Sequence, residues 1–269
     1  MASASTAAAE PSNLSAAILA EIYDTDRFGE LYYGSNDPPD RNLGLAARYM
    51  VSLLRRHGIP FAFLGGWAIR LRGGRRATQD IDIAVAGYMG MDYLKAVLLQ
   101  EPRLCIPQIH GATSIQVFVH TGGHWDPKSP TATVFTVSMD IIIGGNLGTP
   151  PDIPNGTEQI RPAASSTQGR QAVPVIDLFY QVSTKLSAHY TRRDESRIGG
   201  NNDYLDLDFL VRAYTEQIFQ LQTYLDIEHK WTFYADFATL NDPNTTLLVS
   251  QALGLSRDTD TSQMYSVVS

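Results

Sequence analysis

The alternation of apolar and polar positions is clearest at residues 61–85, FAFLGGWAIRLRGGRRATQDIDIAV. A short apolar run ends at Gly65 and Gly66, the next residues fit a brief helix, and Asp80 and Asp82 then alternate with isoleucine in a second apolar run. This pattern predicts a strand, a turn, a helix and a second strand. Because side chains alternate along a strand, both carboxylates are predicted to lie on one face.

Helical periodicity predicts further elements on both sides of this stretch. We expect an amphipathic helix at 15–22 and another at 42–57. Asn42 is a suitable N-cap for the second of these, and Gly58 a suitable end. A third amphipathic helix is predicted at 91–100.

Two β-prone runs follow, at 114–119 and 131–143. The second contains Asp140 within VSMDIII, a lone carboxylate in an otherwise apolar segment. Burying such a charge without a partner is costly, so Asp140 is a candidate for a functional role.

The composition changes after these strands. Residues 144–172 are rich in Gly, Pro, Ser and Thr without periodicity, which indicates a long surface loop or linker. A helix is predicted at 175–189, with Pro174 in its first turn, and another at about 203–214. The expected organisation is therefore a disordered tail (1–12), a core (13–145), a loop or linker (146–172), a helical C-terminal part (173–255) and a second tail (256–269).

Composition narrows the class of protein. The chain has 269 residues, of which 43% are hydrophobic and 18% charged, as in ordinary soluble globular proteins. With 21 Lys+Arg against 28 Asp+Glu the net charge is -7, which disfavours an extended nucleic-acid surface. A single cysteine, Cys105, excludes an internal disulfide and fits a reducing compartment. We expect neither a signal peptide nor a membrane span, and hence a cytoplasmic protein.

The three aspartates have the chemistry of a divalent-cation site. Hard ions such as Mg²⁺ take oxygen ligands and share their remaining positions with water and phosphates. Asp80 and Asp82 could bridge two ions, while Asp140 would help hold the ion that activates an attacking oxygen. Gly65 and Gly66 have no side chains, so their backbone N–H groups could approach a triphosphate closely.

The ordered set GGWAIRLRGGRRATQDIDI followed by Asp140 resembles the signature of the DNA polymerase beta-like nucleotidyltransferase superfamily. It is most similar to the minimal branch that includes antibiotic-modifying enzymes and abortive-infection-type toxins. The resemblance implies an α/β (α+β) fold, with a small mixed nucleotidyltransferase sheet flanked by helices and a helical C-terminal part.

The resemblance also implies a reaction. A nucleoside monophosphate would pass from an NTP, with ATP as the favoured donor, to a hydroxyl of a small-molecule or protein acceptor, and pyrophosphate would leave. By the same resemblance Asp80 and Asp82 are the paired ligands for Mg²⁺ or Mn²⁺. Asp140 becomes the third carboxylate, which also helps to deprotonate the acceptor.

A second block, VPVIDLFYQVSTKLSAHYTRRDES followed by NDYLDLDFL, is similar to the same branch. It implies that Lys185 contacts the triphosphate and that Asp203 or Asp206 orients Lys185 or the nucleotide. The resemblance covers about residues 60–215. It departs from the family in its long loop at 144–172 and in the long stretch after Lys185, which leaves the assignments of Asp203 and Asp206 open.

Other polar residues have two interpretations. Arg72, Arg75 and Arg76 could steady phosphates or could be exposed loop charges, and we include Arg76 among the nucleotide-binding candidates. His120 and His124 have a spacing found in zinc sites, but no cysteine lies nearby in the sequence, so we do not expect zinc there. The loop around Trp125 is a candidate lining for an acceptor pocket.

Two other function classes remain open on the sequence alone. One is a catalytically silent nucleotide-binding or interaction module of the same fold. The other is an ATP-dependent enzyme that adenylates a carboxylate or modifies tRNA. The acidic balance disfavours tRNA, so a small-molecule acceptor is preferred over protein or tRNA, with no membrane partner. The sequence thus predicts the donor half of a reaction and leaves the acceptor open.

Overall fold

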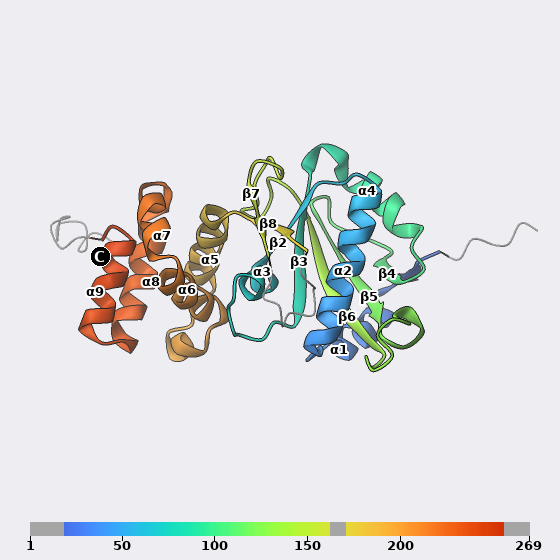
Figure 1. Cartoon of the computed structure of the whole chain (residues 1–269), viewed down its shortest axis with the longest axis horizontal. Helices are drawn as coiled ribbons and strands as arrows, with labels where there is room; N and C mark the ends of the chain where they lie inside the picture. Colours follow the sequence, from blue (N-terminus) through green and yellow to red (C-terminus); the bar gives the residue numbers. More distant parts are fainter. Residues whose placement is uncertain (1–18, 162–170, 256–269) are drawn as a thin grey trace, which may run out of the picture.

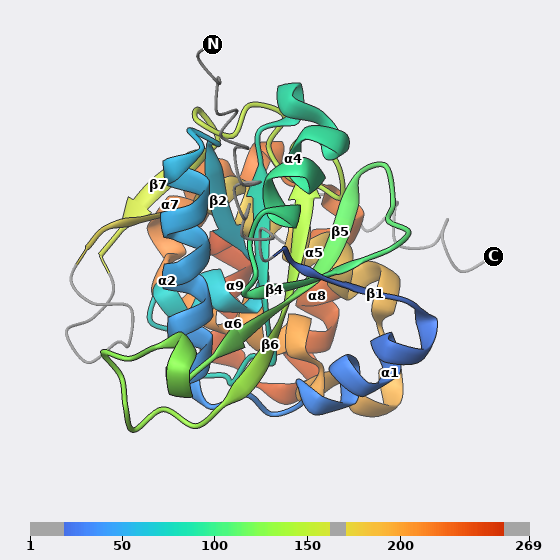
Figure 2. The same cartoon turned by 90° about the vertical axis from the view of Figure 1, so that its right-hand side faces the viewer.

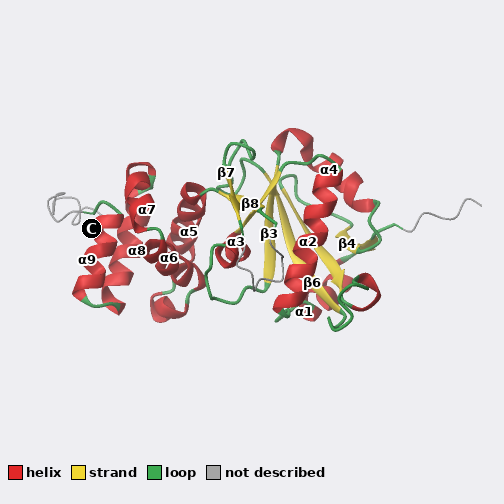
Figure 3. Ribbon diagram, in the orientation of Figure 1, coloured by secondary structure: helices red, strands yellow, loops and turns green. Residues whose placement is uncertain are grey.

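A mixed sheet of eight strands runs through the part of the chain that the computed structural model describes, residues 19–161 and 171–255. Its strand order is β1-β4-β5-β6-β3-β2-β8-β7. Figures 1 and 3 show the sheet in one half of the molecule and a group of helices in the other. The strands are β1 Glu21–Tyr23, β2 Phe61–Leu64, β3 Asp80–Val85, β4 Leu104–Pro107, β5 Ser114–Thr121, β6 Phe135–Ile143, β7 Thr157–Ile160 and β8 Val173–Ile176.

The stretch 61–85 forms the predicted strand, turn, helix and strand. Helix α3 (Gly65–Leu71) connects β2 to β3, and these two strands pair antiparallel. On its other side β3 runs parallel to β6, and Asp82 is the register partner of Asp140. The predicted α/β class with a mixed sheet is therefore confirmed.

The two faces of the sheet differ because side chains alternate along each strand. One face packs against α2 (Asp40–Arg56) and α4 (Gly90–Leu99), with Met50, Leu54, Ile81, Ile83 and Met139 in a large core. The opposite face carries the aspartates between two smaller apolar clusters. One of these clusters includes α1 (Thr25–Gly34), which lies near β1 in Figure 2.

The C-terminal helices pack around a second apolar cluster, which also includes Ile69 of α3. They are α5 Leu178–Arg192, α6 Asn202–Ala213, α7 Thr215–Leu221, α8 Ile227–Leu240 and α9 Pro243–Ala252. Short 3-10 helices also occur at η1 Gly87–Met89, η2 Gly123–Trp125, η3 Glu195–Gly200 and η4 Gln222–Tyr224. Helix α3 lies between the two halves (Figure 1): Trp67 packs in the sheet core, whereas Ile69 packs in the helical core.

The N-terminal prediction was wrong in its described part. Residues 15–18 of the expected helix, and the two expected tails at 1–12 and 256–269, lie outside the described residues. Glu21–Tyr23 form the edge strand β1, which pairs parallel with β4. The helix begins later, at α1, where the side chain of Asp24 accepts a hydrogen bond from the Arg27 N–H.

Asn42 is not the N-cap that the sequence suggested. Helix α2 begins at Asp40 after Pro39 and ends at Arg56, before the predicted stop at Gly58. The buried Asn42 amide instead donates to Thr121 Oγ1 at 2.8 Å and to the Thr133 carbonyl at 2.9 Å. These long-range hydrogen bonds satisfy the amide better than a local cap could.

The segment at 144–176 contains more β-structure than its composition suggests. Strand β7 lies inside the predicted loop and pairs antiparallel with β8; residues 162–170 of that loop lie outside the described residues. The helix expected from residue 175 begins only at Leu178, and Pro174 lies in β8 rather than in a first helical turn. Asp177 caps α5 by accepting from the Tyr180 N–H at 3.0 Å.

The remaining predicted elements are present with small shifts. Helix α4 confirms the prediction for 91–100, β5 extends the predicted strand to Thr121, and β6 starts at Phe135, four residues later than expected. Among the described residues, no helix is both long and apolar enough to cross a membrane.

Candidate active site

Three carboxylates lie on one face of the central strands. Asp80 and Asp82 project from β3, and Asp140 projects from β6 directly beside Asp82 in the parallel register. All three are half-buried. The Thr78 hydroxyl lies 3.3 Å from Asp80 Oδ1 and can hold that side chain in place. The structure therefore places the predicted acidic residues on one face of two adjacent strands.

The aspartates have more negative charge than their surroundings neutralise. Burial raises the pKa of Asp82 to about 8, with the charges of Asp80 and Asp140 adding to the shift and those of Lys185 and Arg192 opposing it. Burial, together with the charge of Asp80, raises the pKa of Asp140 to about 6. A divalent cation would relieve this repulsion, and oxygen ligands of this kind suit Mg²⁺ or Mn²⁺.

Gly65 and Gly66 bring the backbone against these groups. Gly65 has a φ of +62°, and a Cβ added to it would lie 1.8 Å from Asp82 Oδ2. A Cβ on Gly66 would lie 2.6 Å from Thr78 Oγ1 and 2.8 Å from Arg76 Nη2. Gly65 is therefore required by its conformation as well as by its close approach to Asp82, whereas Gly66 is favoured only by its close approach to Thr78 and Arg76.

A buried network of ion pairs joins the loop before β3 to the helical part. Asp206 of α6 accepts two hydrogen bonds from Arg76, at 2.8 and 2.9 Å. Lys185 Nζ of α5 lies 2.7 Å from Asp206 Oδ2 and 3.0 Å from Asp203 Oδ1, and Arg192 binds the other oxygen of Asp203 at 2.7 Å. Arg76, Lys185, Asp203 and Asp206 thus form one connected group.

The pKa of Arg76 reflects this network. Burial by itself would lower that pKa, but the hydrogen bonds and charge of Asp206 outweigh burial and raise it. Asp80 adds to the increase, so Arg76 also experiences the field of the carboxylate group. The network therefore lies at the border of the acidic site.

Arg72 and Arg75 differ from Arg76. The buried guanidinium of Arg72 donates to Glu158 Oε1 at 2.6 Å and to the Ile176 carbonyl at 2.7 Å, and lies 5.7 Å from the ring centre of Tyr214. Arg72 therefore holds β7, β8 and the helical part together, while Arg75 is exposed.

A pocket of about 410 Å³ lies between the start of β5 and the β1–α1 segment, and none of the three aspartates lines it. Gln116 of β5, the register partner of Asp140, lines it and donates to Ser138 Oγ at 3.0 Å. Tyr23 closes another side, and its hydroxyl donates to the Gln116 carbonyl at 2.7 Å. We call this hollow the β5 pocket; its lining includes Phe28, His110 and Ser114. The Trp125 loop, which the sequence suggested as a lining, is not part of it.

The family follows from a comparison with known proteins. Residues 48–253, well over half of the chain, match the family model described as "Nucleotidyl transferase AbiEii toxin, Type IV TA system". This chain belongs to the AbiEii family. The matched residues include the three aspartates, both glycines and the network around Lys185, and the assignment confirms the predicted superfamily and its abortive-infection branch.

One solved structure shares the fold of this chain. An antigenic nucleotidyltransferase-like protein from Paracoccidioides brasiliensis has 15% identity and a TM-score of 0.54, over 78% of this chain and 93% of that chain. A candidate nucleotidyltransferase from Thermotoga maritima has 12% identity and a TM-score of 0.33, over 56% of this chain and 86% of that chain. No curated protein matches the sequence significantly. Nucleotidyl transfer is the general activity that the AbiEii family supports.

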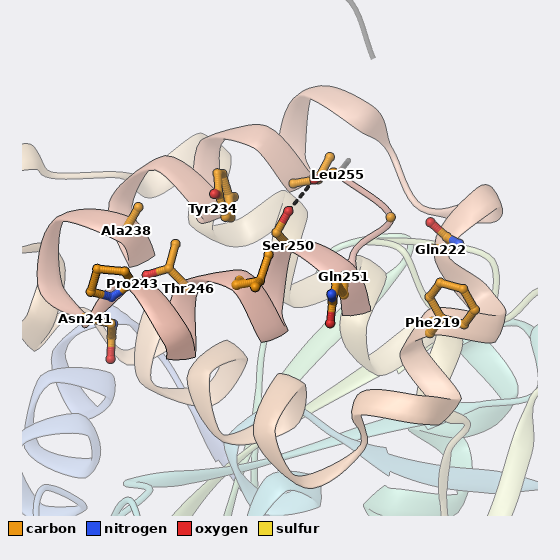
Figure 4. A pocket seen from close by; sticks show the side chains of 12 residues that line it. Phe219, Gln222, Tyr234, Ala238, Asn241, Pro243, Thr246, Ser250, Gln251 and Leu255 are labelled. Carbon is orange, nitrogen blue, oxygen red and sulfur yellow. Dashed lines mark hydrogen bonds between the residues drawn. The ribbon is translucent and has the colours of Figure 1, made fainter. Parts of the chain in front are cut away.

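A larger cavity of this AbiEii-family chain has a lining that differs chemically from the acidic site. It has a volume of about 690 Å³ and lies among α7, α8 and α9 (Figure 4). Tyr234, Asn241 and Gln251 line it together with apolar residues, and Ser250 donates to the Leu255 carbonyl. Its lining contains no carboxylate, imidazole, lysine or arginine, so it lacks the groups that nucleotidyl transfer requires.

Proposed function

We propose that this AbiEii-family chain transfers a nucleoside monophosphate from an NTP to a hydroxyl of a small-molecule acceptor. The observation that carries the proposal is the register of β3 and β6, which sets Asp82 beside Asp140 with Asp80 on the same face. The approach of Gly65 to Asp82 supports it further, because it leaves the backbone bare where phosphates would lie.

The three aspartates fit Mg²⁺ or Mn²⁺. They are hard oxygen ligands on one face, and the raised pKa values of Asp82 and Asp140 reflect negative charge that a cation would offset. Asp80, Asp82 and Asp140 would hold the metal. When bound, the metal would neutralise the triphosphate and make the acceptor hydroxyl more acidic.

The chain's own residues supply binding and proton transfer. Asp203 and Asp206 hold Lys185 and Arg76, and both cations would contact the triphosphate. The acceptor oxygen attacks the α-phosphorus, the bond from that phosphorus to the oxygen bridging to the β-phosphate breaks, and pyrophosphate leaves. Asp140, on the strand beside Asp82, is the carboxylate placed to accept the hydroxyl proton.

The β5 pocket supports a small-molecule acceptor. Its volume of about 410 Å³ falls within the range of small-molecule sites, about 300–1,000 Å³. Gln116, which lines it, is the register partner of Asp140 on the neighbouring strand. The net charge of -7 argues against tRNA, and the lone Cys105 fits the reducing conditions of the cytoplasm.

The test is label transfer with purified protein, Mg²⁺ or Mn²⁺, and each of the four NTPs labelled at the α-phosphate. A cell extract is separated into small-molecule, protein and tRNA fractions, and each is offered as acceptor. We expect label in the small-molecule fraction and none with Asp82→Asn. Binding of an NTP without transfer to any fraction would indicate a silent module, and the absence of both binding and transfer would refute the proposal.

A further inference from the structure

A second group of ligand-type side chains lies on the same face of the sheet, toward the β1 edge. Glu21 of β1 is the register partner of Cys105 of β4. Cys105 is in turn the partner of Phe118 on β5, two residues before His120. Three neighbouring strands therefore present Glu21, Cys105 and His120 side by side, and Cys105 is the only cysteine of the chain.

The ligand atoms of these residues converge. Cys105 Sγ lies 3.2 Å from His120 Nε2 and 3.4 Å from Glu21 Oε2, and the last two atoms are 4.0 Å apart. Around a tetrahedral zinc ion with bonds of about 2.0–2.3 Å, ligand atoms lie roughly 3.3–3.6 Å from one another. Across residues 19–161 and 171–255, this is the one group of three Cys, His, Asp or Glu side chains whose ligand atoms all lie within 4.8 Å.

Neighbouring residues orient two of the three side chains. His120 Nδ1 is within 3.1 Å of Thr136 Oγ1, which leaves Nε2 directed at Cys105, and the imidazole stacks on Trp125. Glu21 Oε1 accepts from Arg27 Nε at 2.7 Å, which leaves Oε2 directed at the same centre. Such outer partners are typical of protein metal sites, where they fix the orientation of the ligands.

The protonation states of the three side chains do not decide between a metal ion and a simple hydrogen bond. Burial lowers the pKa of His120 toward the neutral form that ligates metals, and the hydrogen bond from Arg27 lowers the pKa of Glu21. Burial raises the pKa of Cys105 to about 12, so a metal must displace the thiol proton. The competing explanation is a thiol that simply donates a hydrogen bond to Glu21.

We propose that Glu21, Cys105 and His120 bind Zn²⁺, with the fourth position open to water or another ligand. Thiolate and imidazole select zinc over Mg²⁺, whereas the aspartates select the hard ion, so the two sites differ in metal. The site lies apart from the proposed transfer chemistry. By fixing Glu21 it holds β1, and with it Tyr23, which closes one side of the β5 pocket.

The experiment is titration of the purified, reduced full-length chain with Co²⁺, followed by displacement with Zn²⁺. We expect a near-ultraviolet thiolate-to-cobalt absorption and tetrahedral bands in the visible region, with one equivalent bound in an Asp82→Asn, Asp140→Asn background. Cys105→Ala should abolish the thiolate band. His120→Gln and Glu21→Gln should each weaken zinc binding by about tenfold or more.

His124→Gln is the matched control, because His124 is an exposed histidine close in sequence to His120 but outside the cluster. It should leave zinc binding unchanged. Glu21→Gln changes an exposed side chain on an edge strand, so it tests the site even if Cys105→Ala fails to fold. Two results would overturn the proposal and leave a hydrogen-bonded thiol. One is a wild-type spectrum without a thiolate band, and the other is a zinc affinity of the three ligand variants equal to that of the wild type.

Discussion

Gly58 and Gly65 have the same backbone conformation in different surroundings. Both have a φ of +62°, but a Cβ on Gly58 would meet no atom within 4 Å, whereas one on Gly65 would meet Asp82. Gly58→Ala therefore measures the backbone cost alone, about 1 kcal/mol. Gly65→Ala adds a collision in the acidic site.

We expect Gly58→Ala to lower the free energy of unfolding by about 1 kcal/mol and to keep nucleotide binding and transfer. Gly65→Ala should destabilise more and should abolish transfer. Urea unfolding and the label-transfer assay measure the two effects. Equal behaviour of the two variants would mean that contact between Gly65 and Asp82 has no part in the site.

The raised pKa of Asp82 predicts a pH-dependent stability. The folded pKa is about 8, against about 3.9 for an unfolded aspartate. Between these values unfolding releases a proton, so this residue's contribution to stability is fully present below pH 4 and is lost as the pH rises toward 8. Asparagine does not titrate, so Asp82→Asn removes this pH-dependent loss of stability.

Asp82→Asn should therefore raise the melting temperature of the metal-free protein while abolishing transfer. The gain should be larger at pH 8 than at pH 5, measured by calorimetry in the presence of a chelator. Asp26→Asn, an exposed substitution on α1, serves as control and should change little at either pH. A gain that is the same at both pH values would contradict the shifted pKa.

The shared face of the three aspartates was predictable from sequence for a local reason. Asp80 and Asp82 follow the two-residue repeat of a strand, and Asp140 is a charge in an apolar run. Each aspartate can therefore be recognised from its immediate sequence neighbours. The group of Glu21, Cys105 and His120 was not predictable, because its members are brought together only by the pairing of three strands. In the sequence the spacing of His120 suggests His124 as its partner, whereas in the fold His120 Nε2 lies 3.2 Å from Cys105 Sγ.

At the level of elements, Asp206 joins two helices to the loop before β3. Its side chain is fully buried and accepts from both Arg76 and Lys185. Removing one member of a buried ion pair leaves a charge without compensation, at a cost of about 3–5 kcal/mol. Asp208, on the same helix, pairs with Arg212 at the surface, where such pairs contribute about 0–1 kcal/mol.

Asp206→Asn should thus lower the free energy of unfolding by about 3–5 kcal/mol, and Asp208→Asn by less than about 1 kcal/mol. Urea unfolding followed by circular dichroism measures both. The Asp206 variant should also raise the KM for the NTP, because Lys185 and Arg76 lose their common anchor. If Asp206→Asn lowered the free energy of unfolding as little as Asp208→Asn, the network would contribute little to the stability of the fold.

The start of α5 is an element boundary that the sequence alone does not predict correctly. Pro174 suits the first turn of a helix, and the apolar spacing after it fits a helix, but Val173, Val175 and Ile176 are buried in β8. Their branched side chains suit a strand, and pairing with β2 and β7 decides the outcome. The helix begins only after Asp177, whose side chain caps its first turn.

At the scale of the whole molecule, α3 links the two cores. Trp67 packs with the sheet and Ile69 with the helices, and the contacts of Arg72 and Arg76 cross the same boundary. We therefore expect the sheet and the helical part to unfold as one cooperative unit.

Ile69→Ala should cost about 2–5 kcal/mol and should lower the exchange protection of β3 and α8 together, measured by hydrogen exchange with mass spectrometry. Ile109→Ala, at a position 87% exposed, is the matched control and should lower neither. Loss of protection in α8 alone would show that the two halves open independently.

The outer strands of the sheet have a consequence for solubility. β1 has three residues and β7 has four, and each carries a glutamate, Glu21 and Glu158. Short, charged edge strands are poor templates for pairing with a second chain. If β1 detached, the newly exposed strand β4 would end in Pro107, which lacks a backbone N–H. The fold therefore has successive barriers at this edge against the strand addition that begins aggregation.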